Sequence, residues 1–460
     1  MALKRPVIAF LRAVFYNFHM NIYLHGARIM DPSSGLDAVS DIFISDGKIT
    51  RIGPLGPMTM PEDTCRIEAD GLIAAPGLVD IHVHFREPGF TYKEDIETGS
   101  LAAVAGGFTT VVMMANTKPC VDSVETLQML KARIESVNRQ IPLHILPSAT
   151  VTKGLLGREL TDFVSLSDAG AVGFTDDGIP ILDETLLQNA FSLAEKVGRP
   201  VSLHEEDPRL ITENGINAGA VSSALHLTGS PREAEISMIR RDIEIANRTG
   251  AIVNIQHIST KEGVDLIRAA RAVNPRIHAE ATPHHFSLNE NAVLKYGTNA
   301  KMNPPLRTEE DRLAIIEGLA DGTIETIATD HAPHAAEEKS RDFTAAPSGI
   351  TGLETALPLG ITHLVLPGYL TMMQLLKAMT ASPASLYNLP CGIREGAPAD
   401  LVLFDPEAVQ RVDRFYSRSC NTPFAGAELT GVVQFTIADG KISYRNQEET
   451  VSWKNRPQRS

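Results

Sequence analysis

The chain has 460 residues, of which 43% are hydrophobic, enough for a large core and a smaller second domain. A formal net charge of −14 argues against nucleic-acid and anionic-membrane partners, and no apolar run reaches the ~20 residues that a membrane span requires. The four cysteines form no C-x-x-C pair, which predicts reduced thiols, a cytoplasmic protein and no cysteine-based zinc site.

Residues 1–19 precede the first recognisable element and mix basic with apolar side chains. Arg12 interrupts the apolar stretch that a signal peptide would need, and no A-x-A-like cleavage site follows. We therefore interpret residues 1–19 as a disordered or dispensable extension and not as a targeting segment.

Both ends of the remaining chain predict β-structure, beginning with a strand at 21–24. Two pairs of apolar segments flank an Asp-Gly dipeptide, a strong hairpin signal: 41–45 with 48–52, and 432–437 with 441–444. Neither end has enough residues for its own core, so we expect residues 20–72 and 393–447 to form one composite β-sandwich. The polar tail 448–460 is expected to fray.

Between these ends, short apolar runs alternate with helical patterns. The runs are 78–81, 109–115, 143–149, 171–175, 200–203, 251–256, 276–282 and 326–329. The clearest helical patterns are 93–105, 124–136, 184–196, 233–248 and 261–272. Strands that alternate with helices pair in parallel, and eight such units match a (β/α)8 TIM-type barrel, which we place at residues 73–392.

Nearly every one of these runs ends in a polar residue that can perform chemistry. His82 and His84, at the end of the first run, are two residues apart, so both imidazoles point to the same side of an extended chain. Functional side chains of a barrel sit at the carboxyl ends of its strands. Six candidates occupy such positions and predict a metal site: His82, His84, Asp177, His204, His257 and Asp330. Asp176 stays open as a competitor of Asp177.

The chain resembles the class I dihydroorotases of the amidohydrolase superfamily from about Met20 to about Tyr444. The motifs that carry the resemblance are residues 80–89, 92–95, 105–109, 174–178, 256–260, 303–307 and 328–334. The resemblance implies a cyclic amide hydrolase that interconverts N-carbamoyl-L-aspartate and L-dihydroorotate, the third step of de novo pyrimidine (UMP) biosynthesis. One departure is Ala115, which stands where the family usually has proline.

The resemblance also implies a role for each site residue. Two zinc ions would be held, one by His82, His84 and Asp330 and the other by His204 and His257, with Asp177 bridging them. Asp330 would transfer the proton. The substrate would be bound by Arg86, Asn116, Asn303 and His334. Arg86 follows His84 by two residues and so points toward the same pocket, where a guanidinium can hold a carboxylate with two hydrogen bonds.

Two other functions stay open. A hydantoinase or allantoinase would share the barrel, but such relatives usually bridge their metals with a carboxylated lysine, and the fourth run ends in Asp176-Asp177 without a lysine. A non-catalytic dihydroorotase-like subunit of aspartate transcarbamoylase would have lost metal ligands, whereas every expected ligand is present.

We expect a homo-oligomer acting on a small molecule, with residues 335–348 as a candidate lid.

Overall fold

The computed structural model describes residues 21–54 and 60–446. The predicted extension at 1–19 and the predicted tail at 448–460 lie outside these residues.

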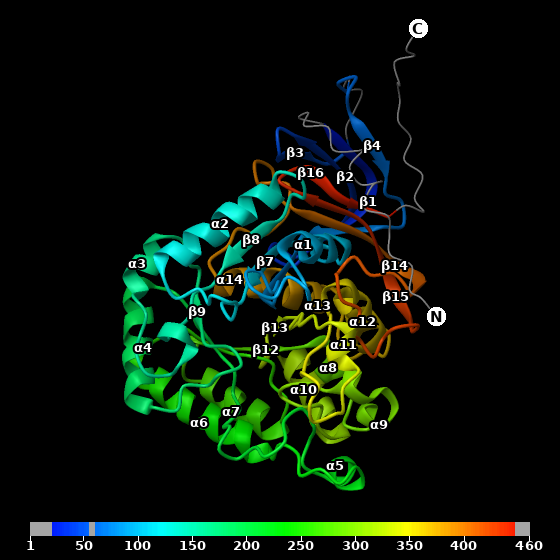
Figure 1. The fold of residues 1–460 in the computed structure, drawn as a ribbon. Coiled ribbons are helices and arrows are strands. Elements are labelled where there is room, and N and C mark those ends of the chain that lie inside the picture. Colours follow the sequence, from blue (N-terminus) through cyan, green and yellow to red (C-terminus); the bar gives the residue numbers. More distant parts are fainter. Residues whose placement is uncertain (1–20, 55–59, 447–460) are drawn as a thin grey trace.

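Eight parallel strands form the centre of the molecule (Figure 1). One sheet contains β6 (Leu78–Val83), β7 (Phe108–Met113) and β8 (His144–Pro147); the other contains β9 (Phe174–Thr175), β10 (Val201–Leu203), β11 (Val253–Ile255), β12 (Ile277–Ala281) and β13 (Thr326–Ile327). The parallel bridges Ala149↔Phe174 and Val83↔His331 join the two sheets at both edges. The ring is therefore closed, and the predicted (β/α)8 barrel is confirmed.

Helices surround this ring (Figure 1). The longer ones are α1 (Ile96–Ala105), α2 (Val124–Asn138), α4 (Glu184–Val197), α6 (Arg232–Thr249), α7 (Lys261–Arg271), α10 (Glu309–Asp321) and α13 (Met372–Met379). Many begin at a side chain that accepts a backbone N–H, as Asp183 does for α4 and Thr260 for α7. Each buries an apolar stripe: in α7 this includes Val264 and Ile267. The alternation of strands and helices thus follows from local sequence signals.

Shorter helices connect these elements. They are α3 (Phe163–Asp168), α5 (Ala220–Ala224), α8 (Pro283–Ser287), α9 (Ala292–Tyr296), α11 (Ala336–Lys339), α12 (Ala356–Gly360) and α14 (Ala381–Leu386). Single turns of 3-10 helix occur at η2 (Lys153–Leu155), η3 (Gly297–Ala300) and η4 (Leu353–Thr355), and a π-helical turn at η5 (Ile361–Val365). Within the described part of the chain, no helix is both long enough and apolar enough to cross a membrane.

Both chain ends build one eight-stranded sheet beside the barrel (Figure 1). Its strands are β1 (Ile22–Asp31), β2 (Leu36–Ser45), β3 (Lys48–Ile52), β4 (Cys65–Glu68), β5 (Ile73–Pro76), β14 (Leu401–Arg411), β15 (Glu428–Ala438) and β16 (Lys441–Arg445). The order is β16-β15-β14-β5-β1-β2-β3, with β4 paired to β1. β5 lies between the two chain ends, because it pairs with β1 on one side and β14 on the other.

The two Asp-Gly turns of this sheet pack against each other. Both residues of each turn have positive φ, 51° and 76° at Asp46 and Gly47 and 49° and 68° at Asp439 and Gly440, as the tightest hairpin turns require. A Cβ added at Gly440 would lie 2.5 Å from the Gly47 Cα atom. Only glycine allows this close approach, which explains the near-identical sequences around the two turns.

Candidate functional site

The six predicted metal ligands meet at the carboxyl ends of the barrel strands. They are His82 and His84 from β6, Asp177 after β9, His204 after β10, His257 after β11 and Asp330 after β13, and each side chain belongs to a residue no more than 8% exposed. Two groups of three have their ligand atoms within 4.8 Å of one another: His82, His84 and Asp177, and Asp177, His204 and His257. Asp177 is common to both groups, so its carboxylate can serve two ions.

The spacing within the first group fits a divalent metal. His82 Nε2 lies 3.6 Å from Asp177 Oδ1 and 3.6 Å from Asp330 Oδ1, and His84 Nε2 lies 3.1 Å from Asp330 Oδ1. Atoms that surround one tetrahedral zinc at its usual bond lengths lie about 3.3–3.6 Å apart. His82 Nε2 is buried and has no hydrogen-bond partner among the described residues. A buried nitrogen without a hydrogen-bond partner is expected where an imidazole coordinates a metal ion.

The second group has comparable spacing. His204 Nδ1 lies 3.0 Å from His257 Nε2 and 3.8 Å from Asp177 Oδ1, and the distance from His257 Nε2 to Asp177 Oδ1 is 3.9 Å. Imidazole nitrogens and carboxylate oxygens are ligands that zinc accepts readily. The residues on both sides of Asp177 therefore fit a metal ion.

The electrostatics of the group keep the carboxylates ionised. Burial by itself would raise the pKa of Asp177, but the neighbouring histidines, His82 above all, hold that pKa well below its usual value. Asp330 follows the same pattern, with burial opposed by His82 and His84 and a lowered pKa as the result. Both side chains are thus available as anionic ligands across the physiological pH range.

Three residues at the barrel mouth have left-handed backbone conformations. Their φ angles are 59° at Arg86, 36° at His257 and 47° at Asp330. Non-glycine residues adopt this conformation only where the surrounding structure imposes it, and such strain gathers at functional sites. All three residues belong to the candidate site or lie directly beside it.

Arg86 and His334 lie together beside the metal-ligand cluster. Arg86 Nη2 is 3.5 Å from His334 Nε2, which lies 2.8 Å from the Ser348 carbonyl oxygen, and Lys93 Nζ is 3.2 Å from His334 Nδ1. Burial and the adjacent Arg86 and Lys93 charges lower the pKa of His334 to about 2. His334 is therefore neutral, and Arg86 and Lys93 carry the positive charge of this region.

Asn116 and Asn303 both touch the cluster directly. Asn116 Oδ1 lies 3.0 Å from His84 Nδ1, and its Nδ2 donates to Asp177 Oδ2 at 3.1 Å. Asn303 Nδ2 lies 3.3 Å from His204 Nε2. The sequence predicted these asparagines as substrate contacts only; the geometry shows that they also hold the side chains that face the metal sites.

Other polar residues near these strand ends face elsewhere. Asp176 accepts hydrogen bonds from Val151 N at 2.8 Å, from Thr152 N at 3.1 Å and from the Thr152 hydroxyl, and burial raises its pKa to about 6. His331 faces Glu94, and His285 Nε2 lies 3.1 Å from the Pro304 carbonyl oxygen. Asp177, and not Asp176, thus points into the cluster.

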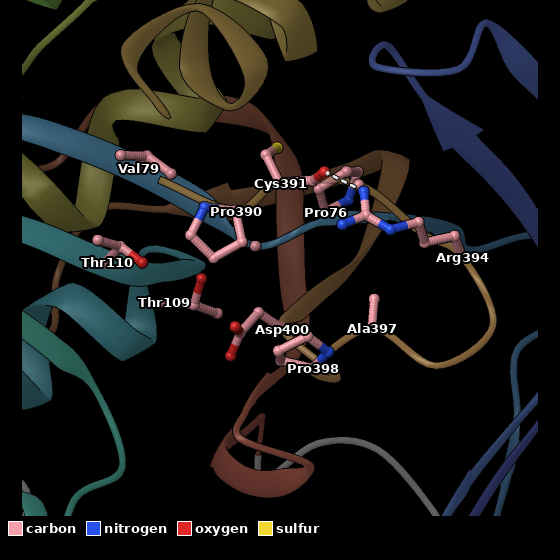
Figure 2. Close-up of a pocket in the computed structure, with 12 residues that line it drawn as sticks. Pro76, Val79, Thr109, Thr110, Pro390, Cys391, Arg394, Ala397, Pro398 and Asp400 are labelled. Atoms are coloured by element: carbon pink, nitrogen blue, oxygen red, sulfur yellow. Dashed lines mark hydrogen bonds between the residues drawn. The ribbon is translucent and has the colours of Figure 1, made fainter. Parts of the chain in front are cut away.

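A cavity of about 450 Å³ opens beside His204, a volume suited to a small organic molecule. Its lining includes Gly178, His204, Glu206, Asn303, Phe343 and Thr344. By contrast, the pocket in Figure 2 measures about 30 Å³ and lies at the opposite, amino-terminal ends of β6 and β7, next to Cys391, Arg394 and Asp400. A space of that size holds about one water molecule and is too small for an organic substrate.

Two buried lysines, Lys301 outside the candidate lid and Lys339 within it, donate hydrogen bonds to backbone carbonyls of the lid. Lys301 Nζ donates to the carbonyl oxygens of Phe343 and Ala346, both at 2.7 Å. Lys339 Nζ donates to the Pro347 carbonyl oxygen at 2.9 Å, and burial together with the Lys301 charge lowers its pKa to about 7. These lysines thus hold, through its backbone carbonyl oxygens, the segment that contributes Phe343 and Thr344 to the cavity wall.

Sequence reasoning missed the acidic residues behind the cluster. Glu280, in β12, lies 2.6 Å from His82 Nδ1, and Glu206 Oε2 lies 3.4 Å from His204 Nε2. Both are at most 2% exposed. A glutamate near the end of a buried barrel strand was the available signal for Glu280, because a buried carboxylate needs a partner.

The chain is similar in sequence to known proteins that are named dihydroorotase. A family model described as dihydro-orotase-like matches residues 71–263. The dihydroorotase of Clostridioides difficile (strain 630) is 50% identical over 424 residues, covering 92% of this chain and 99% of that protein. A dihydroorotase of Streptococcus pneumoniae serotype 4 is 49% identical over 427 residues, covering 92% and 100%.

Solved structures with the same fold include two hydantoinases. L-Hydantoinase from Arthrobacter aurescens matches with a TM-score of 0.82 at 24% identity, over 92% of this chain and 96% of that one. D-Hydantoinase from a Thermus species matches with a TM-score of 0.79 at 26% identity, over 94% and 97%. These matches support the barrel architecture, while the nearly full-length sequence similarity points to dihydroorotases.

The neighbouring aspartates should respond differently to substitution. Asp177→Ala removes a carboxylate shared by both groups, so we expect zinc affinity to fall by more than ~100-fold, beyond what loss of an outer hydrogen-bond partner costs. Asp176→Ala leaves the Val151 amide without its acceptor and should cost about 1–3 kcal/mol of stability while zinc is retained. Zinc titration and urea denaturation of both variants measure this, and greater zinc loss in Asp176→Ala would reverse the assignment.

Proposed function

The chain belongs to the dihydroorotase family, and we propose that it catalyses the reversible cyclisation of N-carbamoyl-L-aspartate to L-dihydroorotate and water. The observation that carries this proposal is the sharing of Asp177 between two histidine pairs, next to a cavity of about 450 Å³ and to the paired Arg86 and His334. A buried metal-binding cluster suits amide hydrolysis, and the adjacent cations suit a substrate with carboxylates.

We propose zinc as the metal, with two ions per chain. His82, His84 and Asp330 would hold one ion, His204 and His257 the other, and Asp177 both. Bound there, zinc supplies Lewis acidity toward the amide carbonyl and lowers the pKa of water toward ~7. The support is the ligand set itself: neutral imidazoles and ionised carboxylates, each almost fully buried.

Asp330 is proposed to carry the proton. Its carboxylate stands at the edge of the cluster, with Oδ1 3.1 Å from His84 Nε2, and its lowered pKa keeps it ionised. In hydrolysis it would take a proton from the attacking water and deliver it to the leaving ring nitrogen. In ring closure it would take the proton from the carbamoyl nitrogen and pass it to the departing carboxylate oxygen, which takes up one further proton from solution to leave as water.

Arg86 is proposed to bind a substrate carboxylate. Its guanidinium is oriented by the Pro333 carbonyl oxygen, to which Nε donates at 3.3 Å, and by His334. A guanidinium offers two parallel N–H groups that match the two oxygens of a carboxylate, which an ammonium group cannot do. His334, kept neutral by its surroundings, together with Asn116 and Asn303 would complete the polar lining around the ring.

The metal requirement provides the first test of this function. Chelator treatment should remove zinc and abolish turnover in both directions, and added zinc should restore both. Bicarbonate should have no effect, because the bridging group is the Asp177 side chain itself and not a carboxylated lysine. Zinc per chain and turnover of dihydroorotate and carbamoyl aspartate are measured on the same samples. Full turnover in metal-free protein would refute the proposal.

Proton transfer can be tested at Asp330. In Asp330→Asn the amide cannot accept the proton, so kcat should fall by at least ~10²-fold for hydrolysis and for ring closure alike. Zinc content is determined in parallel, and Asp176→Asn serves as the control because Asp176 faces the loop at Val151. A near-normal kcat in either direction would assign the proton to another group, with His334 the first to examine.

Substrate choice is tested at Arg86. The wild-type protein should hydrolyse dihydroorotate with a kcat/KM up to ~10⁴-fold above that for dihydrouracil, because a ring without the carboxylate leaves buried donors unpaired. Arg86→Lys should raise the KM for dihydroorotate more than it lowers zinc content, whereas the exposed Arg139→Lys should change neither. Equal kcat/KM for the two rings would favour a hydantoinase instead.

A further inference from the structure

The imidazole of His82 is backed by a carboxylate on the side away from the metal-ligand cluster. Its Nε2 faces Asp177 and Asp330. Its Nδ1 lies 2.6 Å from Glu280 Oε1 and 3.2 Å from Gln256 Nε2, so the carboxylate makes the shorter contact. Since an ionised carboxylate only accepts hydrogen bonds, this contact requires the proton of a neutral His82 to be on Nδ1. The lone pair of Nε2 is then directed into the cluster, where a metal ion needs it.

Glu280 is itself held in place by other buried polar side chains of the barrel. Its Oε2 accepts a hydrogen bond from Asn254 Nδ2 at 3.0 Å; Asn254 Nδ2 also reaches Ser202 Oγ at 3.4 Å, and that hydroxyl lies 3.3 Å from the Tyr387 hydroxyl. All of these residues are buried. A row of hydrogen-bonded polar side chains thus runs through the barrel interior from Tyr387 to His82. It fixes the direction in which the Glu280 carboxylate points.

The other three imidazoles of the cluster have weaker support behind them. His84 Nδ1 faces the neutral amide oxygen of Asn116 at 3.0 Å, and His204 Nε2 lies 3.4 Å from Glu206 Oε2. His257 Nδ1 is buried and, within the part of the chain that is described, has no hydrogen-bond partner. A short carboxylate hydrogen bond is therefore found at His82, which is also the most deeply buried of the four at 0% exposed.

We propose that Glu280 is a positioning residue for the metal site formed by His82, His84 and Asp330. Its carboxylate selects the Nδ1–H tautomer of His82, fixes the ring plane and makes Nε2 a stronger ligand, so that this site binds its ion more tightly. The inference rests on the proposed metal centre, but it concerns metal affinity and does not depend on which ring the enzyme opens.

The test is a zinc titration of the metal-free protein against a chromophoric chelator, without substrate. Glu280→Gln keeps the size of the side chain and removes its charge. Loss of such a partner typically weakens metal binding about 10–100-fold. We expect that loss in one of the two zinc dissociation constants, with the other unchanged. Glu325→Gln is the matched control, because Glu325 is a half-buried glutamate that faces the Nδ1 atom of His278, a histidine outside the metal-ligand cluster, and it should leave both constants as in the wild type.

Each outcome decides the proposal. Wild-type constants in a folded Glu280→Gln protein, or equal weakening of both, would overturn it. If Glu280→Gln does not fold, Asn254→Ala carries the test: it keeps the Glu280 charge but removes the hydrogen bond that orients it, so the same constant should weaken by a smaller factor, and no change would overturn the proposal. A wild-type protein that binds zinc without turning over dihydroorotate would refute the proposed function and leave this inference standing.

Discussion

Buried negative charge at the mouth of the barrel is the constraint on which the site depends. Asp177, Asp330 and Glu280 are each at most 8% exposed, and an ionised carboxylate taken out of water must be compensated by cations or by several hydrogen bonds. Burial opposes a charge on His82, but the adjacent carboxylates, Glu280 above all, raise the pKa of His82, so that imidazoles supply part of the compensation. Metal ions bound in the cluster would supply further positive charge, and the same charge would serve the proposed chemistry.

The barrel makes this concentration of charge possible because it brings distant residues to one point. The bridge between Val83 and His331 closes the ring, and it places His84 next to Asp330 although 246 residues separate them in sequence. No single strand contributes more than two ligands, so each backbone segment remains free to satisfy its own hydrogen bonds. The cost appears as left-handed φ angles at His257 and Asp330, which the rigid ring tolerates.

Much of this could be predicted from sequence because the signals are local. Eight apolar runs gave the barrel strands, Asp-Gly dipeptides gave both hairpins, and the position of a polar residue at the end of a run gave the six predicted metal ligands. The direction in which each side chain points could not be predicted from the sequence. The sequence does not distinguish Asp176 from Asp177, and the hydrogen bonds that Asp176 accepts from Val151 and Thr152 show that it turns away from the cluster. Glu280 was overlooked for the same reason, since its partner lies 198 residues earlier.

The charged side chains of the candidate site are separated by sign, as the proposed binding of metal ions together with a dianionic substrate requires. The carboxylates and imidazoles gather on the side of β6, β9, β10 and β11, whereas Arg86 and Lys93 stand beside His334. His334 remains neutral because burial and the adjacent Arg86 and Lys93 charges lower its pKa. In the proposed reaction, a substrate carboxylate bound by Arg86 would be kept apart from Asp177 and Asp330, and its amide would face the metal-ligand cluster. The proposed binding and the proposed chemistry would thus fall to two groups of side chains that carry opposite charge.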